Sequence, residues 1–206
     1  MSIQTEVARD LLQIKAVQIK TDKADYFTWT SGIKSPIYCD NRLTMSYPEI
    51  RKRIVTAFVE ILSSSNYQPD VIAGCATAGI PHAAWLAEVL DLPMVYVRSS
   101  PKGHGKGNQI EGLVEKGQKA LVIEDLISTG GSSIDAANVL REQGVEVEAV
   151  FAIFTYGLQK SIDQFEQEQL PFYTISGFDH LLQALVEDNE ITRENEQELL
   201  AWRNQL

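Results

Sequence analysis

Short apolar runs alternate with helical patterns through the middle of the chain. Five runs rich in valine and isoleucine are typical of buried strands: residues 71–74, 94–97, 120–125, 147–154 and 172–176. Two of the segments between them, residues 80–90 and 132–143, have the pattern of helices. Strands that alternate with helices predict an α/β fold with a mostly parallel, doubly wound sheet.

The two ends of the chain have a different pattern. Residues 3–19 and 47–62 are expected to be helical, and residues 27–40 to form two short extended pieces around a Ser-Gly turn. Residues 178–186 and 193–202 have the pattern of amphipathic helices. We therefore expect three parts: residues 1–65 contribute to a small hood, residues 66–177 form the core, and residues 178–206 form C-terminal helices.

Composition and charge narrow the class of protein. The chain has 206 residues, and 44% of them are hydrophobic, which is ordinary for a soluble domain. We find no secretory signal, no apolar run long enough to span a membrane and no CxxC pair, so a cytoplasmic location is expected. The net charge of −10 argues against a nucleic-acid partner. A phosphate would have to be bound locally, by a few cations, backbone amides and a metal ion.

Residues 121–132, LVIEDLISTGGS, carry the strongest chemical pattern. A buried strand ends in Glu124 and Asp125, and a small-residue turn then leads into a helix. Amides at a helix N-terminus bind phosphate, whereas two acids repel it but accept hydrogen bonds from a vicinal diol. Each half alone is as readily a solvated strand end or a helix cap. Joined in this order, they predict a site for ribose 5-phosphate.

A cationic segment, RSSPKGHGKGNQIEG, occupies residues 98–112. It holds Arg98, Lys102, His104 and Lys106 in an acidic chain, and its glycines and Pro101 disfavour a helix. By itself it is more simply a solvated basic loop. Beside a phosphate site, however, such a loop would neutralise a leaving pyrophosphate and exclude water as a lid.

These motifs together carry a family resemblance. VIEDLISTGGS resembles the signature of type I phosphoribosyltransferases, and residues 98–112 resemble the catalytic loop of the orotate phosphoribosyltransferases. Residues 74–83 and 27–42 are similar to the pyrophosphate loop and the N-terminal hairpin of that family. The resemblance implies transfer of a phosphoribosyl group from 5-phosphoribosyl diphosphate (PRPP) to orotate. The products would be orotidine 5′-phosphate and pyrophosphate, in pyrimidine (UMP) biosynthesis.

The resemblance also implies roles for individual residues. Arg98, Lys102 and His104 would contact the diphosphate, with Lys102 as the main stabiliser of the leaving group, and Asp125 would join them in catalysis. Ser128 would touch orotate. Mg²⁺ would be held by substrate oxygens, with no direct protein ligand, and loop 98–112 would complete the partner's site in a homodimer. The residues expected to bind PRPP are Arg98, Lys102, His104, Glu124, Asp125, Leu126, Ile127, Ser128, Thr129, Gly130, Gly131 and Ser132.

The chain departs from the family pattern at several cationic positions. Thr30, Ala78 and Ser99 stand where many orotate enzymes have lysine, and Lys34 and Arg42 are candidates to replace them.

The base-binding region departs as well, because IFTYGLQ at residues 153–159 has Tyr156 and lacks the arginine that some members use to contact the base. A phosphoribosyltransferase for another base therefore stays open as an alternative. A non-catalytic regulator that keeps the donor site is a second alternative, disfavoured by the acidic charge. A structural protein with an α/β fold is a third, and it leaves the acids and the lid cations unexplained.

Overall fold

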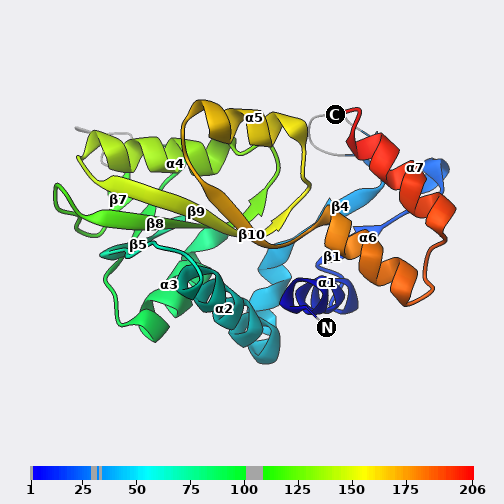
Figure 1. The fold of residues 1–206 in the computed structure, drawn as a ribbon, viewed down its shortest axis with the longest axis horizontal. Helices are drawn as coiled ribbons and strands as arrows, with labels where there is room; N and C mark the ends of the chain where they lie inside the picture. Colours follow the sequence, from blue (N-terminus) through cyan, green and yellow to red (C-terminus); the bar gives the residue numbers. More distant parts are fainter. Residues whose placement is uncertain (1, 29–31, 33, 101–108) are drawn as a thin grey trace.

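A computed structural model describes residues 2–28, 32, 34–100 and 109–206. In this part of the chain the main sheet has six strands in the order β10-β9-β8-β5-β6-β7, and only β7 runs antiparallel to its neighbour (Figure 1). The mostly parallel sheet is the predicted one. Its strands are β5 (Val71–Cys75), β6 (Met94–Val97), β7 (Ile110–Glu111), β8 (Lys119–Ile127), β9 (Glu146–Thr155) and β10 (Phe172–Gly177).

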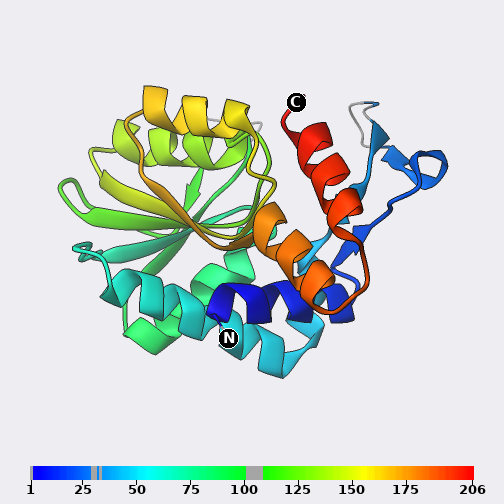
Figure 2. The ribbon, with the colours of Figure 1, turned by 45° about the vertical axis from the view of Figure 1, so that its right-hand side comes forward.

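Helices cover both faces of this sheet. Figure 2 shows α4 (Gly131–Glu142) and α5 (Gln159–Gln167) on one face and α2 (Pro48–Ser63) and α3 (Gly79–Leu90) on the other. Each layer has its own apolar core. Every residue of β5 is buried, as expected of a parallel strand covered on both sides.

The two ends of the chain pack together at one side of the sheet. Here α1 (Ile3–Gln13) contacts α6 (Phe178–Glu187), which leads to α7 (Arg193–Arg203). In Figure 2, α7 lies on the same side of the molecule as the short N-terminal strands. Those strands form two antiparallel pairs, β1 (Val17–Ile19) with β4 (Ile37–Cys39), and β2 (Phe27–Thr28) with β3 (Lys34–Ser35). Two 3-10 helices, η1 (Lys23–Asp25) and η2 (Asn41–Ser46), complete the segment.

The prediction of one helix over residues 3–19 is wrong at its end. The helix stops at Gln13, and Lys15 adopts a left-handed conformation with φ of 59°. The β-branched Val17 and Ile19 then pair with β4. None of the helices in the described ranges is long and apolar enough to cross a membrane.

Strand order places the candidate chemistry at one edge. β5, the first strand of the sheet along the chain, lies between β6 and β8, so the chain leaves its carboxyl end on one side and later returns on the other. In open α/β sheets, ligands bind outside the carboxyl ends of strands at such a switch point. The strand ends at Cys75, Val97 and Ile127 therefore frame the expected site.

Candidate active site

Glu124 and Asp125 lie near the carboxyl end of β8. The Glu124 side chain is buried, and two donors hold its carboxylate: the Asp125 backbone N–H at 2.9 Å and the Ser132 hydroxyl at 3.0 Å. Ser132 belongs to the first turn of α4. The hydrogen bond between Ser132 and Glu124 therefore ties the proposed phosphate-binding turn to the proposed ribose-binding acid.

Burial changes the acidity of both carboxyl groups. Loss of hydration raises the pKa of Glu124 well above its ordinary value, and the neighbouring Asp125 charge raises it further. Burial also raises the pKa of Asp125. Adjacent buried carboxylates resist full ionisation together, so this pair carries less negative charge than two surface acids. Hydroxyl donors or a cation bound beside the pair would favour its ionised form.

Gly130 shapes the turn between β8 and α4. Its φ is 89°, in the left-handed region that favours glycine, and a Cβ there would lie 2.8 Å from the Phe165 ring. Its carbonyl accepts bonds from the Ile134 N–H at 3.0 Å and the Ser133 hydroxyl at 3.1 Å, which closes the first turn of α4. The helix thus begins beside the acid pair, since Ser132 of its first turn donates to Glu124.

The remaining predicted donor-site positions divide between strand and turn. Leu126 and Ile127 still belong to β8 and pair with Phe154 and Thr155 of β9, so the β9 side of this stretch is occupied by the sheet. Ser128 and Thr129 follow the strand and precede α4. Gly131 is the first residue of α4, and a Cβ on it would meet nothing within 4 Å.

A cavity of about 270 Å³ opens between the ends of β5 and β6 and the start of α4. Arg98 lines it from the β6 side, and Ser132 lines it from the helix. The cavity therefore joins three predicted parts of the site: the end of β5, the base of the cationic loop and the phosphate-binding turn. Its lining residues are Cys75, Ala76, Val97, Arg98, Ser99, Gly131, Ser132, Asp135 and Ala136.

The base of the cationic loop is closed like a hairpin. The Arg98 N–H donates to the Gln109 carbonyl at 2.8 Å, and the Gln109 side chain donates to the Arg98 carbonyl at 3.1 Å. The Arg98 guanidinium lies 3.4 Å from the Glu111 carboxylate. The loop thus leaves the sheet and returns to it at the rim of the cavity. Lys102 and His104 lie outside the described residues.

The two candidate replacement cations have different surroundings. Lys34 donates to the Thr28 hydroxyl at 2.7 Å, within the β2–β3 pair. Arg42 makes two hydrogen bonds to Asp40, at 2.6 and 2.8 Å, and its charge lowers the pKa of Asp125 against the effect of burial. Arg42 is therefore the one of the two whose charge reaches the acid pair. Ala78 precedes α3, Ser99 lines the cavity, and Thr30 lies outside the described residues.

Two residues near the acids were given no role from sequence alone. Asn41 donates from its side-chain amide to the Asp125 carbonyl at 2.6 Å. Tyr156 is buried, and burial raises its pKa, with the charge of Asp125 adding to the effect. Asn41 lies in residues 27–42, which resemble the N-terminal hairpin of the family. Tyr156 lies in residues 153–159, where the chain departs from the base-binding pattern of the family. No periodicity or motif distinguishes Asn41 from its neighbours, and only the folded chain brings it to Asp125.

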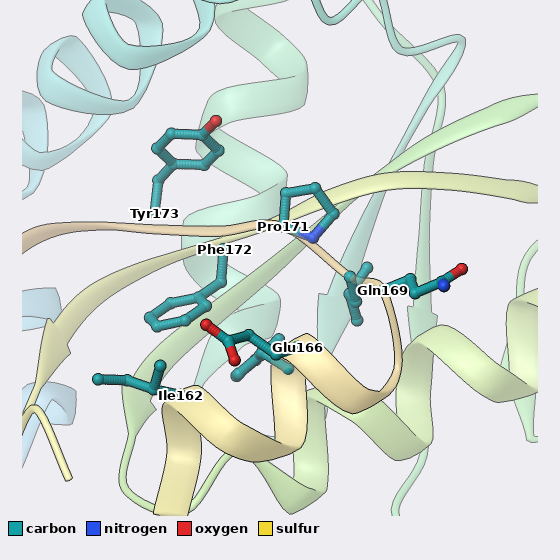
Figure 3. A pocket seen from close by; sticks show the side chains of 8 residues that line it. Ile162, Glu166, Gln169, Pro171, Phe172 and Tyr173 are labelled. Carbon is teal, nitrogen blue, oxygen red and sulfur yellow. The ribbon is translucent and has the colours of Figure 1, made fainter. Parts of the chain in front are cut away.

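A second, larger hollow lies away from this chemistry. It has a volume of about 530 Å³ and is lined by residues of α5 and the start of β10, with Phe172 and Ile162 among them (Figure 3). Because Phe172 begins β10, the hollow lies toward the amino ends of the strands. Its labelled side chains are both apolar and polar, with Glu166 and Gln169 beside Phe172, and it contains none of the predicted site residues.

Comparisons with known proteins agree on one family. The phosphoribosyl transferase domain family matches residues 46–169. The orotate phosphoribosyltransferase of Oceanobacillus iheyensis is 60% identical over 98% of each chain. That of Malacoplasma penetrans is 52% identical over 100% of this chain and 99% of its own.

A solved structure, orotate phosphoribosyltransferase from Aeropyrum pernix, has the same fold. It matches with a TM-score of 0.77 and 26% identity, over 90% of this chain and 99% of its own. The motifs at residues 98–112 and 121–132, the sheet that places them together and these full-length similarities have one consistent explanation. The chain belongs to the type I phosphoribosyltransferases and, among them, to the orotate phosphoribosyltransferase family.

Proposed function

We propose that the chain transfers the phosphoribosyl group of PRPP to orotate at the carboxyl ends of β5, β6 and β8. The observation that carries this location is the junction of β8 and α4. There a buried acid pair, a glycine turn and a helix N-terminus adjoin the cavity lined by Arg98. The reaction yields orotidine 5′-phosphate and pyrophosphate and belongs to pyrimidine biosynthesis.

The donor's ribose 5-phosphate is assigned to residues 124–132. Glu124 and Asp125 accept hydrogen bonds from the two ribose hydroxyls, and the amides and hydroxyls of residues 128–132 bind the 5-phosphate. As the bond from C1 to the leaving oxygen lengthens, positive charge develops on the sugar. The two carboxylates on the sugar side favour that charge, and this is the catalytic role that we assign to Asp125.

The diphosphate is assigned to the cavity and the cationic loop. Arg98 lies at the cavity wall, with 36% of its side chain exposed, so its guanidinium is accessible to an anion. Lys102 neutralises the departing pyrophosphate, and His104 donates a hydrogen bond or a proton to it. Orotate then attacks the opposite face of the sugar through its ring nitrogen, and Ser128 contacts the base.

Mg²⁺ is the metal that suits this donor set. Among the described residues no group of three or more His, Cys, Asp or Glu side chains is placed to hold a metal. The carboxylate oxygens of Glu124 and Asp125 can accept hydrogen bonds from the waters that Mg²⁺ keeps, so the residues present fit a metal held by substrate oxygens without a direct protein ligand. Mg²⁺ keeps several waters and binds readily through substrate phosphates. When bound to the diphosphate it supplies charge neutralisation, while Glu124 and Asp125 orient the sugar hydroxyls.

A homodimer is proposed in which loop 98–112 completes the partner's site. An apolar groove of about 560 Å³ between α2 and α3 supports a self-association surface, and Val89 at its edge is 62% exposed. Both signs of charge line the groove: Arg51, Lys52 and Glu60 belong to α2, and Glu88 belongs to α3. Opposite charges of two copies can therefore pair across a self-complementary contact.

Sedimentation velocity tests the dimer. Val89→Asp introduces a charge into the apolar groove and should shift the protein toward monomer, with loss of activity because the loop no longer reaches a partner. Leu206→Asp, at an exposed apolar residue outside the groove lining, should leave the dimer intact. A Val89→Asp protein that stays dimeric would place the contact elsewhere.

The activity assay follows the loss of orotate absorbance with Mg²⁺ and PRPP, with uracil, adenine and hypoxanthine in parallel. Turnover with orotate alone, abolished in Lys102→Ala but kept in the exposed-lysine control Lys160→Ala, is the expected result. Turnover of another base would retain the donor site and overturn the specificity. Donor binding without turnover of any base would favour a regulator.

A further inference from the structure

β8 extends beyond its neighbour β5. The last residue pair between them is Gly74 with Ile123, whereas β8 continues to Ile127. The Lys119 carbonyl accepts from the Asp70 N–H, on the β5 side. Since backbone groups alternate sides along a strand, Asp125 also directs its N–H and carbonyl toward β5, past the last paired residue.

Side chains take the place of the missing strand partners at Asp125. Its N–H donates to the Glu124 carboxylate at 2.9 Å, and its carbonyl accepts from the Asn41 side-chain amide at 2.6 Å. Asn41 is 1% exposed. A buried backbone group left without a partner costs about 1–3 kcal/mol, so the Asn41 bond has a strong physical reason to persist.

Two neighbouring side chains hold Asn41, and one of them also contacts His82. The Cys39 thiol donates to the Asn41 side-chain oxygen at 3.4 Å, and the Thr44 hydroxyl donates to the Asn41 carbonyl at 2.6 Å. Because that bond uses the only hydroxyl proton, Thr44 accepts in its 3.3 Å contact with Nε2 of His82. His82 therefore carries its proton on Nε2. Burial lowers the pKa of His82 to about 4, so the ring is neutral near pH 7.

The chain of contacts joins three separate parts of the site. Asn41 and Thr44 belong to η2, in the N-terminal segment, and both are fully buried. His82 belongs to the first turn of α3, near the end of residues 74–83. Asp125 belongs to β8. The Asp125 N–H belongs to the peptide bond with Glu124, and the Asp125 carbonyl belongs to the peptide bond with Leu126. The bonds to Glu124 and to Asn41 therefore hold the backbone on the two sides of the Asp125 Cα, which fixes the direction of its side chain.

We propose that Asn41 is a positioning residue: it holds the peptide that follows Asp125, so that the Asp125 carboxylate faces the ribose hydroxyls beside Glu124, and Thr44 and His82 anchor it. The role rests on the proposed function, because it assumes that Glu124 and Asp125 bind the ribose. It predicts a selective effect on ligands that contain ribose. Inorganic phosphate, held by residues 128–132, should not depend on Asn41.

Calorimetric titrations of ribose 5-phosphate and of inorganic phosphate, each with Mg²⁺, test the role. Asn41→Leu keeps the side-chain size and removes the donor. It should weaken the affinity for ribose 5-phosphate about tenfold, which corresponds to the free energy of roughly one hydrogen bond. The affinity for inorganic phosphate should stay unchanged. In the assay kcat/KM for PRPP should fall by a similar factor while KM for orotate stays the same. Asn138→Leu, which removes an amide bound to Glu168 away from the site, should change neither ligand.

Other outcomes overturn specific parts of the proposal. Equal weakening of both ligands, or no weakening, would mean that Asn41 has only a structural role. If Asn41→Leu does not fold, Thr44→Val in the same titrations must show a selective loss of ribose 5-phosphate affinity, and an equal loss of both overturns the role. If the unsubstituted protein binds ribose 5-phosphate no more tightly than inorganic phosphate, the ribose assignment of Glu124 and Asp125 is wrong. The role of Asn41 is then wrong as well.

Discussion

Gly130 and Gly131 are neighbours, yet alanine should have opposite effects on stability at the two positions. At Gly130 the φ of 89° is unfavourable for a residue with a Cβ, at a cost of about 1–2 kcal/mol. The added Cβ would also lie 2.8 Å from a carbon of the Phe165 ring, which stacks on Phe172. Moving that ring off its rotamer costs about 1 kcal/mol. We expect Gly130→Ala to lower the free energy of unfolding by about 2–3 kcal/mol.

Gly131 is the matched control. It is the first residue of α4, it has no positive φ, and a Cβ would meet nothing within 4 Å. Replacement by alanine restricts the unfolded chain and favours the helix, so Gly131→Ala should be neutral or stabilise by up to about 1 kcal/mol. Because Gly131 lines the cavity, its added methyl should nevertheless raise KM for PRPP.

Urea unfolding followed by circular dichroism measures both variants. The expected separation in the free energy of unfolding is about 2 kcal/mol or more, which is well above the error of the extrapolation for matched variants. Equal stabilities of the two variants would refute the reasoning, because they would show that neither the φ angle nor the Phe165 contact limits position 130. A destabilised Gly131→Ala would refute the assignment of open space beside the helix start.

Three other predictions concern the acid pair, Tyr156 and the metal. Burial raises the folded-state pKa of Glu124, so the free energy of unfolding should decline as pH rises from the ordinary glutamate pKa through the raised one. Glu124→Gln should flatten this decline, measured by urea unfolding from about pH 5 to 9. An unchanged slope in the variant would contradict the shift. Tyr156→Phe should lower the unfolding free energy by about 1–2 kcal/mol, since it removes a buried hydroxyl bound to the Cys39 backbone, and thermal unfolding measures the loss. Chelation with EDTA should abolish turnover and excess Mg²⁺ should restore it; full activity in EDTA would exclude the metal.

The sequence predicted the sheet because its signals there are strong. β5, β8 and β9 are short apolar runs with no competing helical period, and the structure confirms them near the predicted bounds. The order of elements in residues 121–132 could also be predicted: a strand, two acids, a glycine turn and then a helix. Each of these is indicated by residues next to it in the sequence and does not depend on a distant contact. The site residues derived from it stay predictions; of residues 124–132, Gly131 and Ser132 line the cavity beside Arg98.

Elements that depend on distant contacts were not predictable in this way. α5 has a polar sequence, QKSIDQFEQ, with few apolar positions, and its place on the sheet depends on Phe165 packing against Phe172. β1 was taken for the end of a helix because its strand character comes from pairing with β4, which lies about twenty residues away. Asn41 has the same limitation, since its amide meets Asp125 across 84 residues of chain.

The electrostatics of the site explain how a chain with net charge −10 can bind a polyanionic donor. In the proposed assignment the groups that face the sugar phosphate at the end of β8 are amides and hydroxyls, which attract an anion without adding positive charge. Burial raises the pKa of Glu124 and of Asp125 and so limits their ionisation. In the proposed assignment this reduces their repulsion of the incoming phosphates until the ribose hydroxyls engage them. Arg98, the described cation at the cavity, lies close to Glu111 and is partly neutralised by it. The charge of the leaving pyrophosphate therefore falls mainly to Mg²⁺ and the loop cations, and for this reason Lys102→Ala should affect kcat more than donor affinity.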